Sequence, residues 1–99
     1  MNVYVHDADL FCEMCGIRRK YQLTKRGVED SGDSNDFPQG PYPNGGGEAD
    51  TPAHCGECGI FLENPLTKDG VEYVRERIEE PAQNAVTQLW HRFYQPYLD

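Results

Sequence analysis

The chain has 99 residues and a formal net charge of −8, and 37% of its residues are hydrophobic. A chain of this length holds one domain at most, and no apolar run approaches the roughly 20 residues that span a bilayer. The charge disfavours wrapping a nucleic-acid duplex over a broad surface, because such binding depends on Lys and Arg displacing counterions. With a mean hydropathy of −0.76, the core is small and often needs a metal, disulfides or a partner.

Residues 2–6 alternate in polarity, with Val3 and Val5 on one face, which predicts a short strand. The N-terminus has neither the basic nor the apolar region of a secretory signal, so we expect a cytoplasmic protein. In that compartment paired cysteines bind metals more often than they form disulfides.

A short pattern follows this strand and occurs twice in the chain. Residues 12–17 and 55–60 both read C-x-x-C-G-I, and they contain all four cysteines. Four thiolates in two pairs match the tetrahedral, soft-ligand preference of Zn²⁺, and the glycine after each pair suits a tight turn with positive φ. The sequence therefore predicts one structural Zn²⁺ held by Cys12, Cys15, Cys55 and Cys58.

Two other uses of these cysteines are disfavoured. Thioredoxin-like redox pairs would need a βαβ context and a helix N-terminus, whereas each pair here is expected to lead through glycine into a strand. A catalytic zinc keeps one position open for water, but four cysteines fill all four positions. His6, His54 and His91 stand in no metal-binding or catalytic pattern, so we expect a protein that is not an enzyme.

The segment after the first motif is expected to form a second strand. Ile17, Tyr21 and Leu23 fall on one face of it, and the strands flanking Cys12–Cys15 would form a hairpin with the metal at its tip. Residues 1–26 hold five of the nine basic residues and three acids. This basic face is either a solvated strand surface or a nucleic-acid site, with Tyr21 available for stacking. The phosphate contacts would come from Arg18, Lys20, Lys25 and Arg26.

Residues 27–53 change in character. They are rich in Gly and Pro, contain six acids and no Lys or Arg, and show no periodicity. We expect a long, partly mobile loop inserted between the halves of the metal site. Phe37 and Tyr42 are either a short docking motif or anchors that pin this loop to the domain, and the second reading is favoured.

Two helices are predicted after the second motif and a short apolar strand at 60–62. Thr67 is a good N-cap for the first helix, which Pro81 would end near Glu80. The second helix is expected over about 82–95, with Pro96 stopping it. Its predicted apolar stripe consists of Val86, Leu89, Trp90, Phe93 and Tyr97, with Tyr94 at the border.

The aromatic cluster of the second helix has two readings. Core packing is favoured, because large aromatic side chains supply much of the burial in small domains. The alternative is an exposed patch for a protein partner, since Trp and Tyr are enriched at interface hot spots. That patch would comprise Trp90, Phe93, Tyr94 and Tyr97.

The order of knuckle, strand, loop, knuckle and strand resembles the zinc-ribbon family over residues 3–23 and 54–62. The resemblance implies a structural zinc on the four cysteines. The chain departs from common ribbons because 39 residues separate the pairs, more than the usual spacing of about 15–20. The stretch 55–76 also looks like small uncharacterised bacteriophage proteins, which implies an intracellular phage or prophage product and no established activity.

Together these features predict an α+β fold: zinc-ribbon hairpins, a long irregular acidic loop and two C-terminal helices. We expect one zinc-stabilised domain, divided into a first knuckle and hairpin (1–26), a loop (27–53), a second knuckle (54–66) and a helical part (67–99). The favoured function is a protein-binding module or inhibitor of host machinery, such as a defence or transcription system, in the host cytoplasm. The alternative is a nucleic-acid-binding zinc ribbon that uses the basic segment 18–26.

Overall fold

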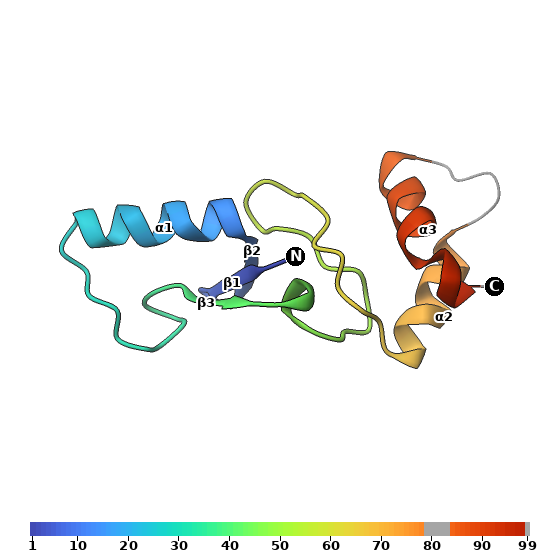
Figure 1. Ribbon diagram of the computed structural model, residues 1–99, viewed down its shortest axis with the longest axis horizontal. Helices are drawn as coiled ribbons and strands as arrows, with labels where there is room; N and C mark the ends of the chain where they lie inside the picture. Colours follow the sequence, from blue (N-terminus) through green and yellow to red (C-terminus); the bar gives the residue numbers. More distant parts are fainter. Residues whose placement is uncertain (79–83, 99) are drawn as a thin grey trace.

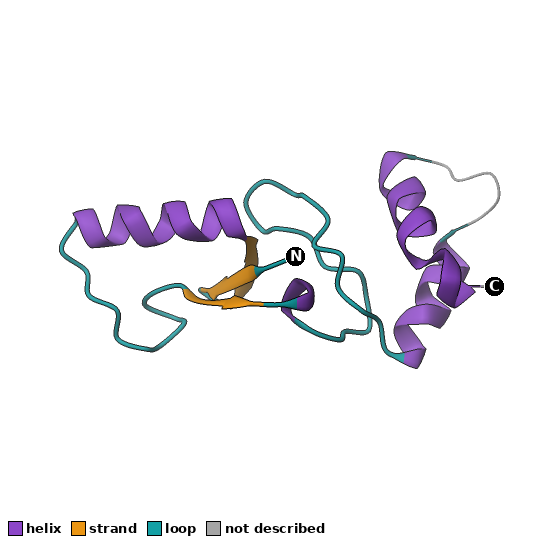
Figure 2. Ribbon diagram, in the orientation of Figure 1, coloured by secondary structure: helices purple, strands orange, loops and turns teal. Residues whose placement is uncertain are grey.

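A small antiparallel sheet lies near the centre of an elongated molecule of 50 × 23 × 16 Å (Figure 1). The computed structural model describes residues 1–78 and 84–98. Three strands and three α-helices confirm the predicted α+β class (Figure 2). The elements are β1 (Val3–His6), β2 (Asp9–Cys12), α1 (Glu13–Lys25), β3 (Gln39–Tyr42), the short 3-10 turn η1 (Asn44–Gly46), α2 (Lys68–Arg77) and α3 (Ala85–Leu98).

The hairpin of the protein closes before the first cysteine pair, not around it. The predicted strand at the N-terminus is confirmed as β1, which pairs with β2 in a register that places Val3 opposite Cys12. The two-residue turn between them consists of Asp7 and Ala8, both with positive φ, as a tight hairpin turn that matches the strand twist requires. The expectation of a hairpin with the metal at its tip was therefore wrong.

Helix α1 replaces the strand predicted at 17–23. Cys12 stands at its N-cap position with extended backbone, and Glu13 lies in its first turn. The alternation of Ile17, Tyr21 and Leu23 resembled a strand pattern, but the residues between them are mostly strong helix formers. Gly16 is helical, so the positive φ expected there is wrong. Glycine is required at this position for another reason, because a Cβ here would overlap the ring of Tyr4 on β1.

The loop between the two motifs contributes to the sheet. Its residues 39–42 form β3, an edge strand beside β1. Phe37 is 4% exposed, which confirms its expected role as an anchor, whereas Tyr42 is 45% exposed although it pairs with β1. Backbone bonds from Asp7 to the carbonyl of Ser34 and from Gly45 to the carbonyl of Met1 fasten the loop to the N-terminal hairpin.

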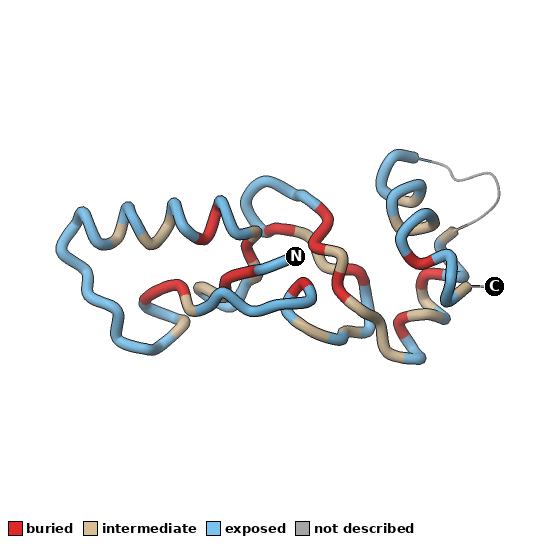
Figure 3. Tube along the Cα trace, viewed as in Figure 1, coloured by how far each residue is buried: buried red, intermediate tan, exposed pale blue. Residues whose placement is uncertain are grey.

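The strand predicted at 60–62 is reduced to a single bridge between His54 and Phe61. Its side chains nevertheless enter the interior, because Phe61 and Leu62 are both buried. Leu62 belongs to a core at the junction of the sheet and the cysteines (Figure 3). The buried members of this first core are Val3, Phe11, Cys15, Cys55 and Leu62.

The two C-terminal helices are confirmed, with revised ends. The Thr67 side chain caps α2 by accepting a hydrogen bond from the Gly70 N–H at 3.0 Å. The predicted end near Glu80 lies outside the described residues, and the described helix stops at Arg77. Helix α3 continues through Pro96, so the predicted stop was wrong. Proline here removes only one helical hydrogen bond, close to the C-terminus. No described helix has the length and apolar character needed to cross a membrane.

A second core forms where α2 and α3 meet the segment after the second motif. Its buried members are Phe61, Val74 and Tyr94. Tyr94, predicted to border the apolar stripe, is fully buried. Four residues predicted to face inward are 37–60% exposed: Val86, Leu89, Phe93 and Tyr97. The Phe93 ring nevertheless packs edge-on against Phe61 of the second core, with ring centres 5.5 Å apart.

Asn64 connects the two cores, and sequence reasoning did not single it out. It is fully buried; its side-chain oxygen accepts from the Ala53 N–H at 2.7 Å, and its amide donates to the carbonyls of Thr51 and Pro65 at 3.1 Å. Its own carbonyl accepts the Tyr94 hydroxyl at 2.6 Å. Burial raises the pKa of Tyr94, which keeps this hydroxyl a donor.

We expect Asn64→Ala to lower the free energy of unfolding by about 2–3 kcal/mol, because it removes three hydrogen bonds from a fully buried side chain to the backbone of Thr51, Ala53 and Pro65. Urea denaturation followed by circular dichroism measures this loss. Asn35→Ala, at an exposed position, is the control and should change little. Equal midpoints for the Asn64→Ala variant and the wild type would contradict the role assigned to Asn64.

Candidate metal centre

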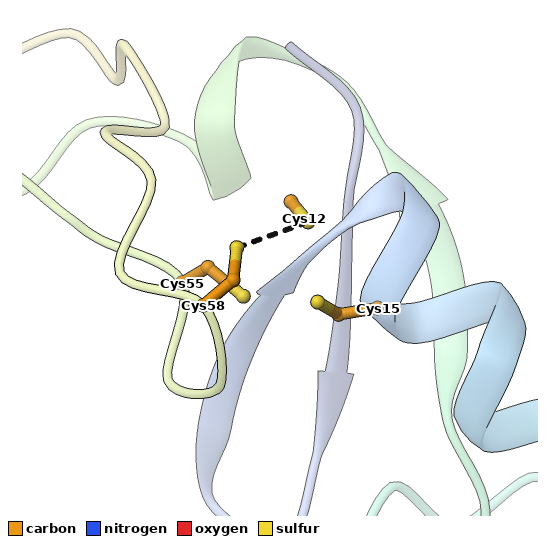
Figure 4. A group of neighbouring side chains, drawn as sticks. All are labelled: Cys12, Cys15, Cys55 and Cys58. Carbon is orange, nitrogen blue, oxygen red and sulfur yellow. Dashed lines mark hydrogen bonds between the residues drawn. The ribbon is translucent and has the colours of Figure 1, made fainter.

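The two C-x-x-C motifs meet at the end of the sheet although they are far apart in sequence (Figure 4). Cys12 is the last residue of β2, and Cys15 lies in the first turn of α1. Cys55 and Cys58 come from the irregular segment beside this junction. All four Sγ atoms lie within 4.8 Å of one another, so the residues predicted as ligands are positioned to bind one metal ion.

The sulfur spacing fits a tetrahedral ion. Four sulfurs at Zn–S bonds of about 2.3 Å in a tetrahedron are about 3.8 Å apart, and Cys12 Sγ lies 3.8 Å from Cys58 Sγ. A disulfide would require about 2 Å, and the four cysteines are free thiols. Cys15 and Cys55 are buried while Cys58 is exposed, so one side of the cluster borders solvent.

The second motif forms a tight turn that presents its thiols. The carbonyl of Cys55 accepts a hydrogen bond from the Gly59 N–H, and the Cys55 N–H donates to the carbonyl of Ile60. Gly59 has φ of 79°, the conformation expected for the glycine after the pair. The Gly56 N–H donates to the carbonyl of Leu10 on β2 at 2.8 Å. This bond holds the second motif against the strand that carries the first.

Positive charge lies beside part of the cysteine cluster. Cys12 and Cys15 lie at the N-terminus of α1, where the helix dipole stabilises negative charge. Arg18 Nη1 and Arg19 Nε lie 3.4 Å from the Glu57 carboxylate between the second pair of cysteines. The two ion pairs link α1 to the second motif and place positive charge beside the cluster.

The pKa values of the two buried thiols diverge. Burial alone would raise the pKa of Cys55, but backbone hydrogen bonds around Cys58 outweigh it and lower this pKa to about 6. Burial raises the pKa of Cys15 above its ordinary value, and hydrogen bonding with the neighbouring thiols adds to the effect. Without a metal the cluster therefore holds protons at neutral pH, and a bound dication must displace them.

His54 joins the second motif to α3. Trp90 Nε1–H donates to its Nε2 at 3.1 Å, and its Nδ1 lies 3.0 Å from the carbonyl of Gly59. Because the indole can only donate, Nε2 accepts and Nδ1 carries the proton. Both ring nitrogens are thus engaged outside the thiol cluster. Sequence reasoning missed this contact because residues 54 and 90 share no local pattern.

The residues predicted for partner binding separate into two groups. Phe93 and Tyr97 are 37% and 60% exposed and can meet a partner. Tyr94 is fully buried and Trp90 is partly buried in the second core. Burial excludes Tyr94 from a docking surface in this fold, so it must be removed from the predicted patch.

The residues predicted to contact nucleic acid are also divided, because they lie on a helix and not on a strand. Lys20 Nζ lies 5.4 Å from the centre of the Tyr4 ring, over the sheet. Helical geometry places Arg18 and Lys25 on another flank of α1, and Arg26 is the C-cap residue of this helix. Arg19, which the prediction left out, lies 3.9 Å above the ring of Phe11.

No protein-family model, curated protein or solved structure matches this chain. The zinc-ribbon resemblance is therefore supported by the four-cysteine cluster alone. The resemblance to bacteriophage proteins gains no support from these comparisons.

We expect Cys55→Ser to abolish tight metal binding and to unfold much of the first core, because both depend on this buried ligand. Metal content and thermal unfolding of the purified variant measure the two effects. Met14→Ser is a matched control within the first motif, since Met14 is 73% exposed. A Cys55→Ser variant that stayed fully folded and metal-free would contradict a structural role for the cluster.

Metal affinity should fall as the pH falls, because protons compete with the metal for the thiolates. Between pH 8 and 6 the thiol of Cys15 must lose its proton on binding, and below about pH 6 Cys55 also takes up a proton. Co²⁺ titrations followed by visible absorption at pH 8, 7 and 6 measure the affinity. A constant affinity over this range would contradict displacement of thiol protons.

Proposed function

We propose that the four cysteines hold one structural Zn²⁺ and that the protein acts as a non-catalytic binding module. The sulfur separation of 3.8 Å between Cys12 and Cys58 is the observation that carries the first part. Four thiolates complete a tetrahedral coordination sphere and leave no position for a water or a substrate. The metal would then stabilise the fold, and binding would be carried by the surface.

The surface that best supports binding is the outward face of α3. Val86, Leu89, Phe93 and Tyr97 recur at intervals of three or four residues, which places them on one side of a helix. All four are more than one-third exposed. The helix lies at the opposite end of the molecule from α1 (Figure 1). A repeated apolar face of this kind fits helix-in-groove recognition, in which a partner's groove receives the anchors.

The proposed partner is a protein of host machinery, such as a defence or transcription component. The net charge of −8 supports a partner with a basic, nucleic-acid-binding surface, because opposite charges steer association. On such a partner the acidic chain would imitate a nucleic acid and inhibit the partner by occupying its nucleic-acid-binding surface. The resemblance of residues 55–76 to phage proteins motivates the host setting.

To test this, we expect Val86→Glu with Leu89→Glu to weaken binding to a purified partner at least about tenfold, since charges would have to be buried. The partner is first captured by affinity purification and identified by mass spectrometry. Gln88→Glu with Gln95→Glu adds the same charge on the opposite side of α3 and is the matched control. If both double variants retain zinc and bind the partner equally well, this face of α3 does not form the interface.

The second candidate is nucleic-acid binding through α1. The observation that favours it is Tyr21, which is 65% exposed beside Lys25, with Nζ 6.0 Å from its ring centre. An exposed aromatic ring next to cations is a platform for unpaired bases. Arg18 lies on the same flank of the helix.

A mobility-shift titration with a single-stranded oligonucleotide at low and moderate salt tests this candidate. Binding should weaken with salt and in a Lys25→Gln variant, because phosphate contacts release counterions. Arg77→Gln removes one charge from α2 and serves as the control. Absence of binding at low salt would exclude the candidate.

A further inference from the structure

A cavity of about 250 Å³ lies beside the metal centre, where the inner flank of α1 meets the hairpin and the second motif. Its lining comes from three segments that are far apart in sequence. The lining residues are His6, Arg19, Gln22, Leu23, Arg26 and Glu57. None of them belongs to the four-cysteine cluster, and Arg26 alone was among the residues predicted to contact nucleic acid.

Arg19 is fixed in this cavity before any ligand arrives. Its side chain is only 30% exposed, and its guanidinium lies 3.9 Å above the Phe11 ring, within the range of a cation–π contact. Its Nη1 donates to His6 Nδ1 at 3.1 Å. An arginine held on two sides loses little conformational entropy when it binds an anion.

The cavity is rich in hydrogen-bond donors. Since a guanidinium can only donate, His6 Nδ1 must accept, and the neutral ring carries its proton on Nε2. The amide of Gln22 and the guanidinium of Arg26 add further donors. The buried Nε of Arg19 has no hydrogen-bond acceptor among the described residues, although Glu57 Oε1 lies 3.4 Å away. This nitrogen has almost no accessible surface, so its nearest charged neighbour is Glu57 and it is not a contact for a ligand.

The charge of the site is positive in an acidic protein. Among the residues that the structure describes, Glu57 is the one acid lining the cavity, and its carboxylate is shared between Arg18 and Arg19. Arg26 adds a further positive charge whose ion-pair partner is not found among the described residues. The chain as a whole carries −8, so this local excess of cations is a specific feature of the fold.

We infer that this cavity binds the phosphate group of a nucleotide, either free or within single-stranded nucleic acid. A phosphate presents oxygens in several directions, so it can accept from the two guanidinium groups, the imidazole N–H and the amide of this lining together, and arginine–phosphate pairs are frequently bidentate. The volume is below the range typical of whole small-molecule ligands. It therefore suits a phosphate with its sugar and leaves the base outside.

The inference gives the second candidate function a defined site, but it stands without that candidate if a free nucleotide binds. The test uses the zinc-loaded full chain at low salt and titrates it separately with adenosine monophosphate and with a single-stranded oligothymidylate. Heteronuclear NMR follows the side-chain signals of His6, Arg19 and Gln22. We expect saturable shifts at these three residues with at least one of the two probes.

Two charge-removing variants locate the site. Arg19→Gln should weaken binding by about tenfold or more, and Arg26→Gln, at an exposed position on the rim, should weaken it severalfold without affecting the fold. Arg92→Gln removes one exposed charge on α3 and should bind like the wild type. If Arg19→Gln fails to fold, Arg26→Gln and the wild-type shift map still decide the question.

The outcomes separate this inference from the second candidate function. Binding of the mononucleotide alone supports the cavity and removes the nucleic-acid role, while stronger binding of the oligonucleotide supports both. Oligonucleotide binding that depends on Lys25 but not on Arg26, with shifts outside the cavity, overturns the inference and leaves the nucleic-acid role. No saturable binding of either probe, or equal weakening by Arg92→Gln, also overturns it.

Discussion

The meeting of four thiols is the constraint on which the rest of the structure depends. It joins Cys12 and Cys15 to Cys55 and Cys58 across 39 intervening residues. Closing a loop costs only about 0.6 kcal/mol more for each doubling of its length, whereas binding of Zn²⁺ by small zinc domains contributes on the order of 10–16 kcal/mol. A dication held here can therefore support a long loop that buries little apolar surface of its own.

The constraint extends through the first core into the helical part. Cys15 and Cys55 are themselves core residues, in contact with side chains from both strands of the hairpin and from the segment after the second motif. From there the buried Asn64 reaches Tyr94, and His54 reaches Trp90. Two polar links thus fasten α3 to the half of the molecule that contains the four cysteines, so the helices are oriented by hydrogen bonds as well as by apolar packing.

The same arrangement separates the surfaces of the molecule. Positive side chains are concentrated on α1, where Arg18 and Arg19 offset the charge of Glu57 and of the thiol cluster. The apolar face of α3 lies at the far end (Figure 1). The two proposed binding surfaces can be altered independently, because residues this far apart couple weakly.

The sequence by itself determined which four cysteines come together, the first strand, the Thr67 cap and the two C-terminal helices. Each of these follows from a local pattern: cysteine spacing, alternation, or a capping residue before a helical repeat. Tertiary contacts decided the rest. Alternation at 17–23 fitted a strand, but good helix formers and the close contact of Gly16 with Tyr4 fit a helix. Tyr94 was buried because α3 is oriented by contacts with α2 and Asn64, and Arg19 entered a cavity because Phe11 and His6, from another element, hold it there.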